Sequence, residues 1–235
     1  GGGIVCKGTG SGGEIYCLDV HNDKYRFYFW KAGTPYGLHS TITPSGKQHV
    51  VATYDGVDQK IYINGNLDAS ASPNAGDLDT NDHEVSIGSR QSGSTTYDLN
   101  VKGVIFQVRI YNRALSESEI QQNYNNPQDP ITDGLVLWLN FDEGSGDKVY
   151  DRSDEGNHGT IYGATWATVQ DYTYVRNIGP LYDGHSDSEW LEEDSVLYVD
   201  QVSSASTSTH RWITLNNAQT ITQNGTYTFS YYEQY

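Results

Sequence analysis

The sequence predicts an all-β protein, a sandwich or a barrel, with one short helix. The 235-residue chain reads as short strands separated by clusters of Gly, Asn, Asp and Ser, which is the pattern of all-β domains. It contains 19 Tyr, a residue type enriched in strands, and 25 Gly, which suit tight turns. At this length one large all-β domain can bury a core without a disulfide or a metal.

The predicted strands are joined by turns of recognisable chemistry. Asp55-Gly56 and Asn64-Gly65 each supply a residue that tolerates positive φ. The strand candidates are Ile4–Lys7, Glu14–Val20, Tyr25–Trp30, Gln48–Tyr54, Lys60–Ile63, Glu84–Ile87, Val104–Tyr111, Gly134–Phe141, Asp194–Val199, Arg211–Leu215 and Thr226–Tyr232.

One segment breaks the strand pattern. Ser116-x-x-Glu119 is a capping box and predicts a short helix through about Tyr124. The polar run that follows, with Pro127 and Pro130, ends this helix and predicts a linker over 125–133. The stretch Ala164–Asp194 has weak periodicity and reads as a long excursion, with a short helix around Ser188–Glu193.

The charge balance excludes two classes of function. Lys and Arg number 14 and Asp and Glu 30, so the net charge is −16. Such a chain repels nucleic-acid phosphates and anionic membrane surfaces. No apolar run approaches the ~18 residues that a transmembrane helix needs. A start at Gly1 rather than Met indicates a processed or excised chain.

Cys6 and Cys17 lie in two strand candidates joined by a Gly- and Ser-rich loop. Strands of one hairpin bring such positions opposite each other, so a cross-strand disulfide is feasible if the register agrees. The alternative is two small buried thiols. The disulfide is favoured because the rest of the chain reads as exported.

Catalytic motifs are missing from the sequence. A glycosidase needs two carboxylates at a fixed separation, and the acidic run at Glu189–Asp194 lacks the spacing that sandwich glucanases use. Neither G-x-S-x-G nor H-E-x-x-H occurs. The sequence therefore predicts that the protein is not an enzyme.

Sugar binding is a better candidate, because aromatic faces stack on pyranose rings. The aromatic residues that could serve are Trp30, Tyr36, Tyr97 and Trp190, although such residues more often build sandwich cores. Asn224-Gly225-Thr226 is a glycosylation sequon that also reads as a turn.

Three stretches resemble the laminin-G-like, concanavalin A-like jelly-roll family. His49–Gly56 with Lys60–Gly65 is similar to the family's central hairpin, and Val108–Ser116 to its closing strand and helix start. Gly134–Gly146 resembles the family's opening strand, yet it follows the closing motif. The resemblance implies an antiparallel jelly-roll sandwich whose segment order is inverted.

The inverted order divides the chain into three segments. Residues 1–124 correspond to the C-terminal part of a family domain, 125–133 to a linker, and 134–235 to the N-terminal part. Either the chain closes on itself as a circular permutant, or each copy completes its neighbour head to tail in a ring or filament. A third reading is a window cut from a tandem array. Pairing of Thr226–Tyr232 with Ile4–Lys7 within one chain would indicate self-closure.

The resemblance also implies a calcium ion. It points to loops around Asp151 and Asn157, and to a turn that corresponds to Asp183 or Asp200. The family's acidic pair before the closing strand is replaced by apolar and amide residues around Phe106, which removes candidate ligands. The alternative is that these Asp and Asn residues simply form turns.

Together these observations predict a non-catalytic extracellular or cell-surface protein with a structural or adhesive role. The inverted order adds the expectation of a homo-oligomer or filament built by head-to-tail strand complementation. The alternative function is a calcium-assisted carbohydrate-binding module of a larger secreted protein.

Overall fold

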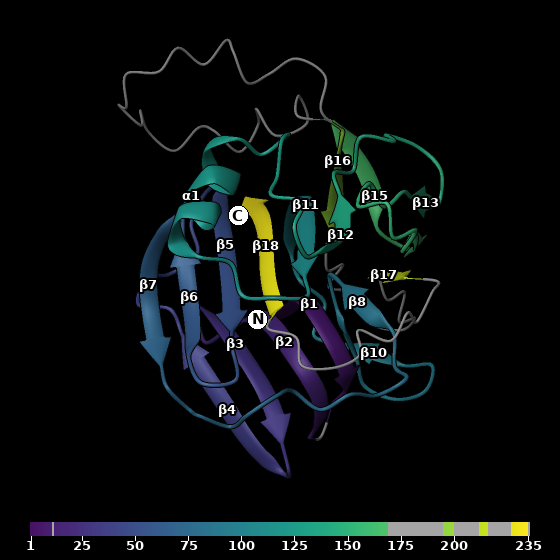
Figure 1. Ribbon diagram of the computed structural model, residues 1–235. Coiled ribbons are helices and arrows are strands. Elements are labelled where there is room, and N and C mark those ends of the chain that lie inside the picture. Colours follow the sequence, from purple (N-terminus) through teal and green to yellow (C-terminus); the bar gives the residue numbers. More distant parts are fainter. Residues whose placement is uncertain (11, 169–194, 200–211, 216–226, 235) are drawn as a thin grey trace.

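The computed structural model describes residues 1–10, 12–168, 195–199, 212–215 and 227–234. In these residues two mainly antiparallel sheets stack face to face, and a helix covers part of the outer face of the second sheet (Figure 1). The predicted β-sandwich with a short helix is confirmed.

The first sheet runs in the order β13-β14-β17-β8-β1-β2-β3-β4, and β9 and β10 attach to it beside β1. Residues 1–124 and residues 134–235 both contribute strands to it. Its strands are β1 (Gly2–Thr9), β2 (Gly13–His21), β3 (Lys24–Lys31), β4 (Thr34–His39), β8 (Val85–Ile87), β9 (Arg90–Gln91), β10 (Tyr97–Asp98), β13 (Lys148–Val149), β14 (Gly159–Tyr162) and β17 (Trp212–Leu215).

The second sheet runs in the order β15-β16-β11-β18-β5-β6-β7, and β12 also pairs with β11. It too mixes strands from both segments of the chain. Its strands are β5 (Gln48–Tyr54), β6 (Gln59–Ile63), β7 (Asn66–Ala71), β11 (Gly103–Tyr111), β12 (Leu135–Leu139), β15 (Thr165–Thr168), β16 (Ser195–Val199) and β18 (Tyr227–Gln234).

Strands β1 and β18 do not pair with each other, which differs from the expected pairing of Thr226–Tyr232 with Ile4–Lys7, although both segments of this one chain complete the two sheets. Strand β1 pairs with β2, β8 and β9, whereas β18 lies between β5 and β11 in the other sheet. In Figure 1 the yellow β18 stands in the middle of the second sheet, next to β5. The strands of 134–235 therefore join those of 1–124 by pairing with β11, β5 and β8.

The main core fills the space between the two sheets. Alternate residues of β2 and β3 supply Leu18, Phe27 and Phe29, while β5 and β11 supply Ala52 and Ile110 from the opposite side. All five side chains are at most 1% exposed. This period-2 alternation is the pattern that predicted the strands.

Local signals in the sequence are confirmed where they are strongest. The helix α1 (Glu117–Asn125) has Ser116 as its N-cap, and the capping box with Glu119 is complete. The hairpin between β6 and β7 turns at Asn64 and Gly65, with φ values of 50° and 79°. Cys6 stands opposite Cys17 in the β1–β2 pair, and the two form the predicted disulfide.

Several short strands were not predicted from the sequence. Strands β4 and β7 are edges of their sheets and consist mostly of exposed or half-exposed residues, so they lack an apolar alternation. Strand β15 lies inside the stretch that was read as an excursion. The helix expected around Ser188–Glu193 lies outside the described residues.

His49 connects the second sheet to the helix. Its imidazole is fully buried on β5, and the ring stacks on Tyr124 of α1 at 5.7 Å between centroids. Burial lowers the pKa of His49 to about 3, and the nearby Arg109 cation acts in the same direction. The side chain is therefore neutral under the helix at physiological pH.

We predict that His49 makes the protein less stable in acid. In the unfolded chain His49 takes up a proton below pH 6.5, whereas in the fold it does so only near pH 3. The free energy of unfolding therefore falls as the pH drops through this window. Urea unfolding measures this free energy at pH 7 and at pH 4. The decrease between the two pH values should be smaller for His49→Gln than for the wild type.

The matched control is His39→Gln, because His39 is exposed at the edge of the first sheet. Its stability should change with pH as the wild type does. An equal fall for His49→Gln and the wild type would contradict the role assigned to His49.

Candidate functional site

The aromatic residues predicted to bind sugar are separated in the structure. Trp30 packs against the buried disulfide and Tyr28 on the outer face of the first sheet. Tyr36 packs against the main core on the opposite face. Tyr97 is 8% exposed, and its hydroxyl donates a hydrogen bond to Glu84 at 3.3 Å. Trp190 and the sequon residue Asn224 lie outside the described residues.

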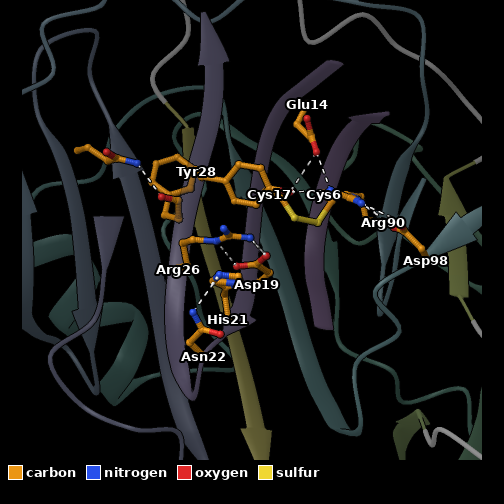
Figure 2. A network of polar contacts seen from close by, with 12 residues as sticks. Cys6, Glu14, Cys17, Asp19, His21, Asn22, Arg26, Tyr28, Arg90 and Asp98 are labelled. Carbon is orange, nitrogen blue, oxygen red and sulfur yellow. Dashed lines mark hydrogen bonds and ion pairs between the residues drawn. A yellow bond between two sulfur atoms is a disulfide. The ribbon is translucent and has the colours of Figure 1, made fainter. Parts of the chain in front are cut away.

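Carboxylates on the outer face of the first sheet are matched by arginines, as Figure 2 shows. Arg90 reaches Glu14 at 2.7 Å and Asp98 at 2.8 Å, and Arg26 reaches Asp19 at 2.5 Å. Burial raises the pKa of Asp19, and the Arg26 guanidinium opposes that rise. These acids form ion pairs beside the buried disulfide, and Glu14 and Asp19 are themselves buried, so their contacts are structural.

Asp151, a predicted calcium ligand, organises a turn instead. Its Oδ1 accepts hydrogen bonds from the backbone N–H groups of Trp138 and Ser153, each at 2.9 Å. Its Oδ2 accepts from the Ser153 hydroxyl at 2.8 Å and from the Asn157 N–H at 2.9 Å. Four donors occupy the lone pairs that a calcium ion would need. The carboxylate in this arrangement does not fit a calcium site.

The other predicted calcium ligands add no cluster in the described part of the chain. The Asn157 amide donates to the Val136 carbonyl at 2.8 Å, and its buried Oδ1 has no hydrogen-bond partner. Within residues 1–10, 12–168 and the three short described strands, no group of three His, Cys, Asp or Glu side chains could hold a metal. Asp183 and Asp200 lie outside the described residues.

The turn at residues 151–157 fixes the backbone of Trp138. Asp151 accepts from its N–H, and the Arg152 N–H donates to its carbonyl at 2.9 Å. The Arg152 guanidinium then bonds to Asn140 at 2.8 Å and to Asp142 at 2.6 Å. The backbone of Trp138 is therefore held at both its N–H and its carbonyl.

A pocket of about 330 Å³ opens beside this tryptophan. It is lined by one tryptophan and by several residues with polar side chains. Asp154 and Glu155 at its rim are exposed. The lining includes Asn112, Thr132, Trp138, Arg152, Asp154 and Glu155. An aromatic wall with a few convergent polar groups is typical of small-ligand sites.

Behind the pocket, a buried arginine lies close to the ring of Trp138. Arg109 is 0% exposed, and its guanidinium carbon lies 5.9 Å from the centroid of the Trp138 ring. It donates to the carbonyl of Pro127, and Gln107 donates to the same oxygen at 3.1 Å. We call residues 126–133 the strap. The hydrogen bonds of Arg109 and Gln107 to the Pro127 carbonyl hold the strap against the second sheet.

A side chain of helix α1 binds the backbone of the strap near its other end. The Asn123 side chain is 1% exposed, accepts from the Ile131 N–H at 2.8 Å and donates to the Tyr111 hydroxyl at 3.0 Å. Thr132 of the strap then forms part of the pocket wall. The segment predicted as a polar linker is thus packed on the sheet. Sequence reasoning missed this because the strap's partners, Gln107 and Arg109, read as ordinary positions of a strand.

The sequence comparison places this architecture in a family. Residues 2–121 match the model of the concanavalin A-like lectin/glucanases superfamily, of laminin-G type. The chain therefore belongs to this superfamily. A search of the curated proteins found no match. In the described residues no helix is long and apolar enough to cross a membrane.

We predict that Asp151→Ala destabilises the protein by roughly 3 kcal/mol, because it leaves several buried donors without an acceptor. Thermal or urea unfolding measures this loss. Glu155→Ala is the matched control, because Glu155 is exposed in the same turn and its backbone is not in the left-handed region. Its free energy of unfolding should change by less than about 0.5 kcal/mol. Equal stabilities of the two variants would show that Asp151 does not organise the turn.

Proposed function

We propose that the protein is a non-catalytic extracellular binding module that attaches to glycans through the pocket beside Trp138. The observation that carries this proposal is that Trp138 lines one pocket together with the polar residues Asn112, Thr132 and Arg152. Membership of a lectin/glucanase superfamily supports a sugar as the ligand. The disulfide between Cys6 and Cys17 supports an oxidising, extracellular setting.

The carboxylates of the pocket support binding rather than hydrolysis. Glycoside hydrolysis needs an acid and a second carboxylate on opposite sides of the scissile bond. Asp154 and Glu155 are adjacent in the chain and both exposed at one rim. They are suited to accept hydrogen bonds from sugar hydroxyls.

We predict that glycan binding depends on Trp138. A glycan array identifies the sugars bound, and titration of the strongest one measures its Kd. Trp138→Ala should raise this Kd at least about tenfold, which corresponds to ~1.4 kcal/mol. Because Trp138 also packs against the cluster under α1, Glu155→Gln is a second variant that leaves this packing intact and should also weaken binding.

Trp30→Ala is the control, because this tryptophan lies on the first sheet away from the pocket. It should bind as the wild type does. If Trp30→Ala lost binding and the pocket variants kept it, the glycan site would lie on the first sheet. If the array showed no bound glycan, the proposed ligand class would be wrong.

Calcium assistance of this binding remains a proposal from the family resemblance. The hydrogen bonds of Asp151 leave Asn157, Asp183 and Asp200 as the ligands to test. Calorimetric titration of the wild type with Ca²⁺ tests it directly. Calcium binding by the wild type that is lost in Asp183→Asn or Asp200→Asn would support calcium assistance. If the wild type bound no Ca²⁺, calcium would be removed from the proposal.

A second proposed function is assembly into a surface filament, which is compatible with the partners of β11. This strand pairs with β12, β16 and β18, all of which come from residues 134–235. Sheet completion therefore depends on the meeting of two chain segments, which one copy or two copies can supply.

We predict that the protein forms species larger than its single-chain mass of 26.1 kDa. Light scattering after size exclusion should show a mass that rises with protein concentration. A single-chain mass at every concentration would contradict the assembly role and leave the glycan proposal untouched.

A further inference from the structure

The pocket beside Trp138 carries an excess of negative charge. Asp154 and Glu155 belong to its lining, and both residues are exposed. In the part of the chain that the structure describes, neither of the two carboxylates takes part in an ion pair. They are therefore available to a ligand that brings a cation and hydrogen-bond donors of its own.

The arginines around the pocket are already bound by other carboxylates. Arg152 belongs to the lining, and its guanidinium donates to Asp142 at 2.6 Å. Arg113 follows a lining asparagine in sequence, and its guanidinium lies 2.6 Å from Glu119 and 2.8 Å from Asp133. The charges of these two cations are thus compensated within the protein, whereas those of the two lining acids are not.

The buried Arg109 does not offset these acids from within the pocket. It is 0% exposed, lies behind the ring of Trp138 and is not part of the pocket lining. Because a cation already lies near the indole, the ring attracts a second cation only weakly. A positively charged group of a ligand would therefore be held by the two carboxylates.

The backbone that carries the two acids is fixed by the neighbouring turn. The N–H groups of Ser153 and Asn157, one on each side of the acids, both donate to the Asp151 carboxylate at 2.9 Å. Asp154 itself has a φ of 71°, in the left-handed region that Asp tolerates better than most residues. A fixed backbone reduces the entropy that the site loses when a ligand binds.

We propose that this pocket selects sugars with a free amine, such as glucosamine units, and rejects sulfated and uronic-acid sugars. This inference rests on the proposed glycan-binding function and names the class of glycan. A protonated amine compensates the charges of Asp154 and Glu155, whereas a sulfate or a carboxylate of a ligand adds another negative charge beside them. The net charge of −16 on the chain acts in the same direction at longer range.

Three oligosaccharides that differ in one substituent test this selectivity. They are an oligomer of glucosamine, its N-acetylated form and its N-sulfated form, all of the same length. Calorimetric titration of the wild type at pH 6 and low salt measures the three Kd values. The amine form should bind at least about fivefold more tightly than the N-acetylated form, and the N-sulfated form should bind most weakly. Added salt should reduce both differences, because it screens exposed charges.

Two variants assign the selectivity to the pocket. Asp154→Asn and Glu155→Gln each remove one charge and keep a hydrogen-bond acceptor. Each should lower the preference for the amine form over the N-acetylated form by about two- to threefold. Asp23→Asn is the matched control, because Asp23 is exposed, has a φ of 58° and lies in the turn between β2 and β3, outside the pocket lining. It should keep the full preference.

The outcomes separate this inference from the function on which it rests. Equal Kd values for the amine and N-acetylated forms, or tightest binding of the N-sulfated form, would overturn the inference and leave glycan binding in place. A preference that both pocket variants retain in full would also overturn it. If no sugar bound, on the array or in these titrations, the inference and the proposed function would both be wrong.

Discussion

The structure depends on the packing of β11 against two layers, the main core between the sheets and the layer under the helix. One face of this strand gives Ile105, Val108 and Ile110 to the main core, and the other gives Arg109 and Tyr111 to the layer under the helix. Ile105 and Val108 are three residues apart, so strict alternation would place them on opposite faces. The register shift between them in the pairing with β18 returns both to the core. This irregularity keeps the core-facing residues of β11 on one side of the strand.

Burial of Arg109 determines how the outer layer is built. A buried cation is costly unless hydrogen bonds and nearby polar or aromatic groups compensate it. Here the compensation comes from the Gln107 side chain, the Pro127 carbonyl and the ring of Trp138. The same contacts hold the strap on the sheet and support the indole of the pocket. Stability and the candidate ligand surface therefore share one set of interactions.

The sequence could predict those features whose signal is local. The capping box at Ser116, the turn at Asn64 and the strand alternation each involve neighbours within a few residues. The pocket could not be predicted in this way, because Asn112, Trp138 and Glu155 meet only after the sheet has formed. The edge strands β4 and β7 could not be predicted because their mostly exposed residues do not alternate between apolar and polar types.

Asp151 illustrates a different limit of the sequence. An aspartate in a loop with nearby Ser and Asn has the composition of both a calcium loop and a hydrogen-bonded turn. The three-dimensional positions of the four donors around its carboxylate decide between the two for this residue. Composition contains no information about where those donors point.

The disulfide at Cys6 and Cys17 has a consequence for local motion. It joins β1 and β2 near the middle of their pairing, eleven residues apart in sequence and fully buried. Backbone amides exchange with solvent through local openings whose free energies differ across a fold. Strands tied covalently at their centre cannot separate one at a time, so β1 and β2 open as one unit. In an oxidising environment an opening that exposes the backbone of one of these strands therefore also moves the other.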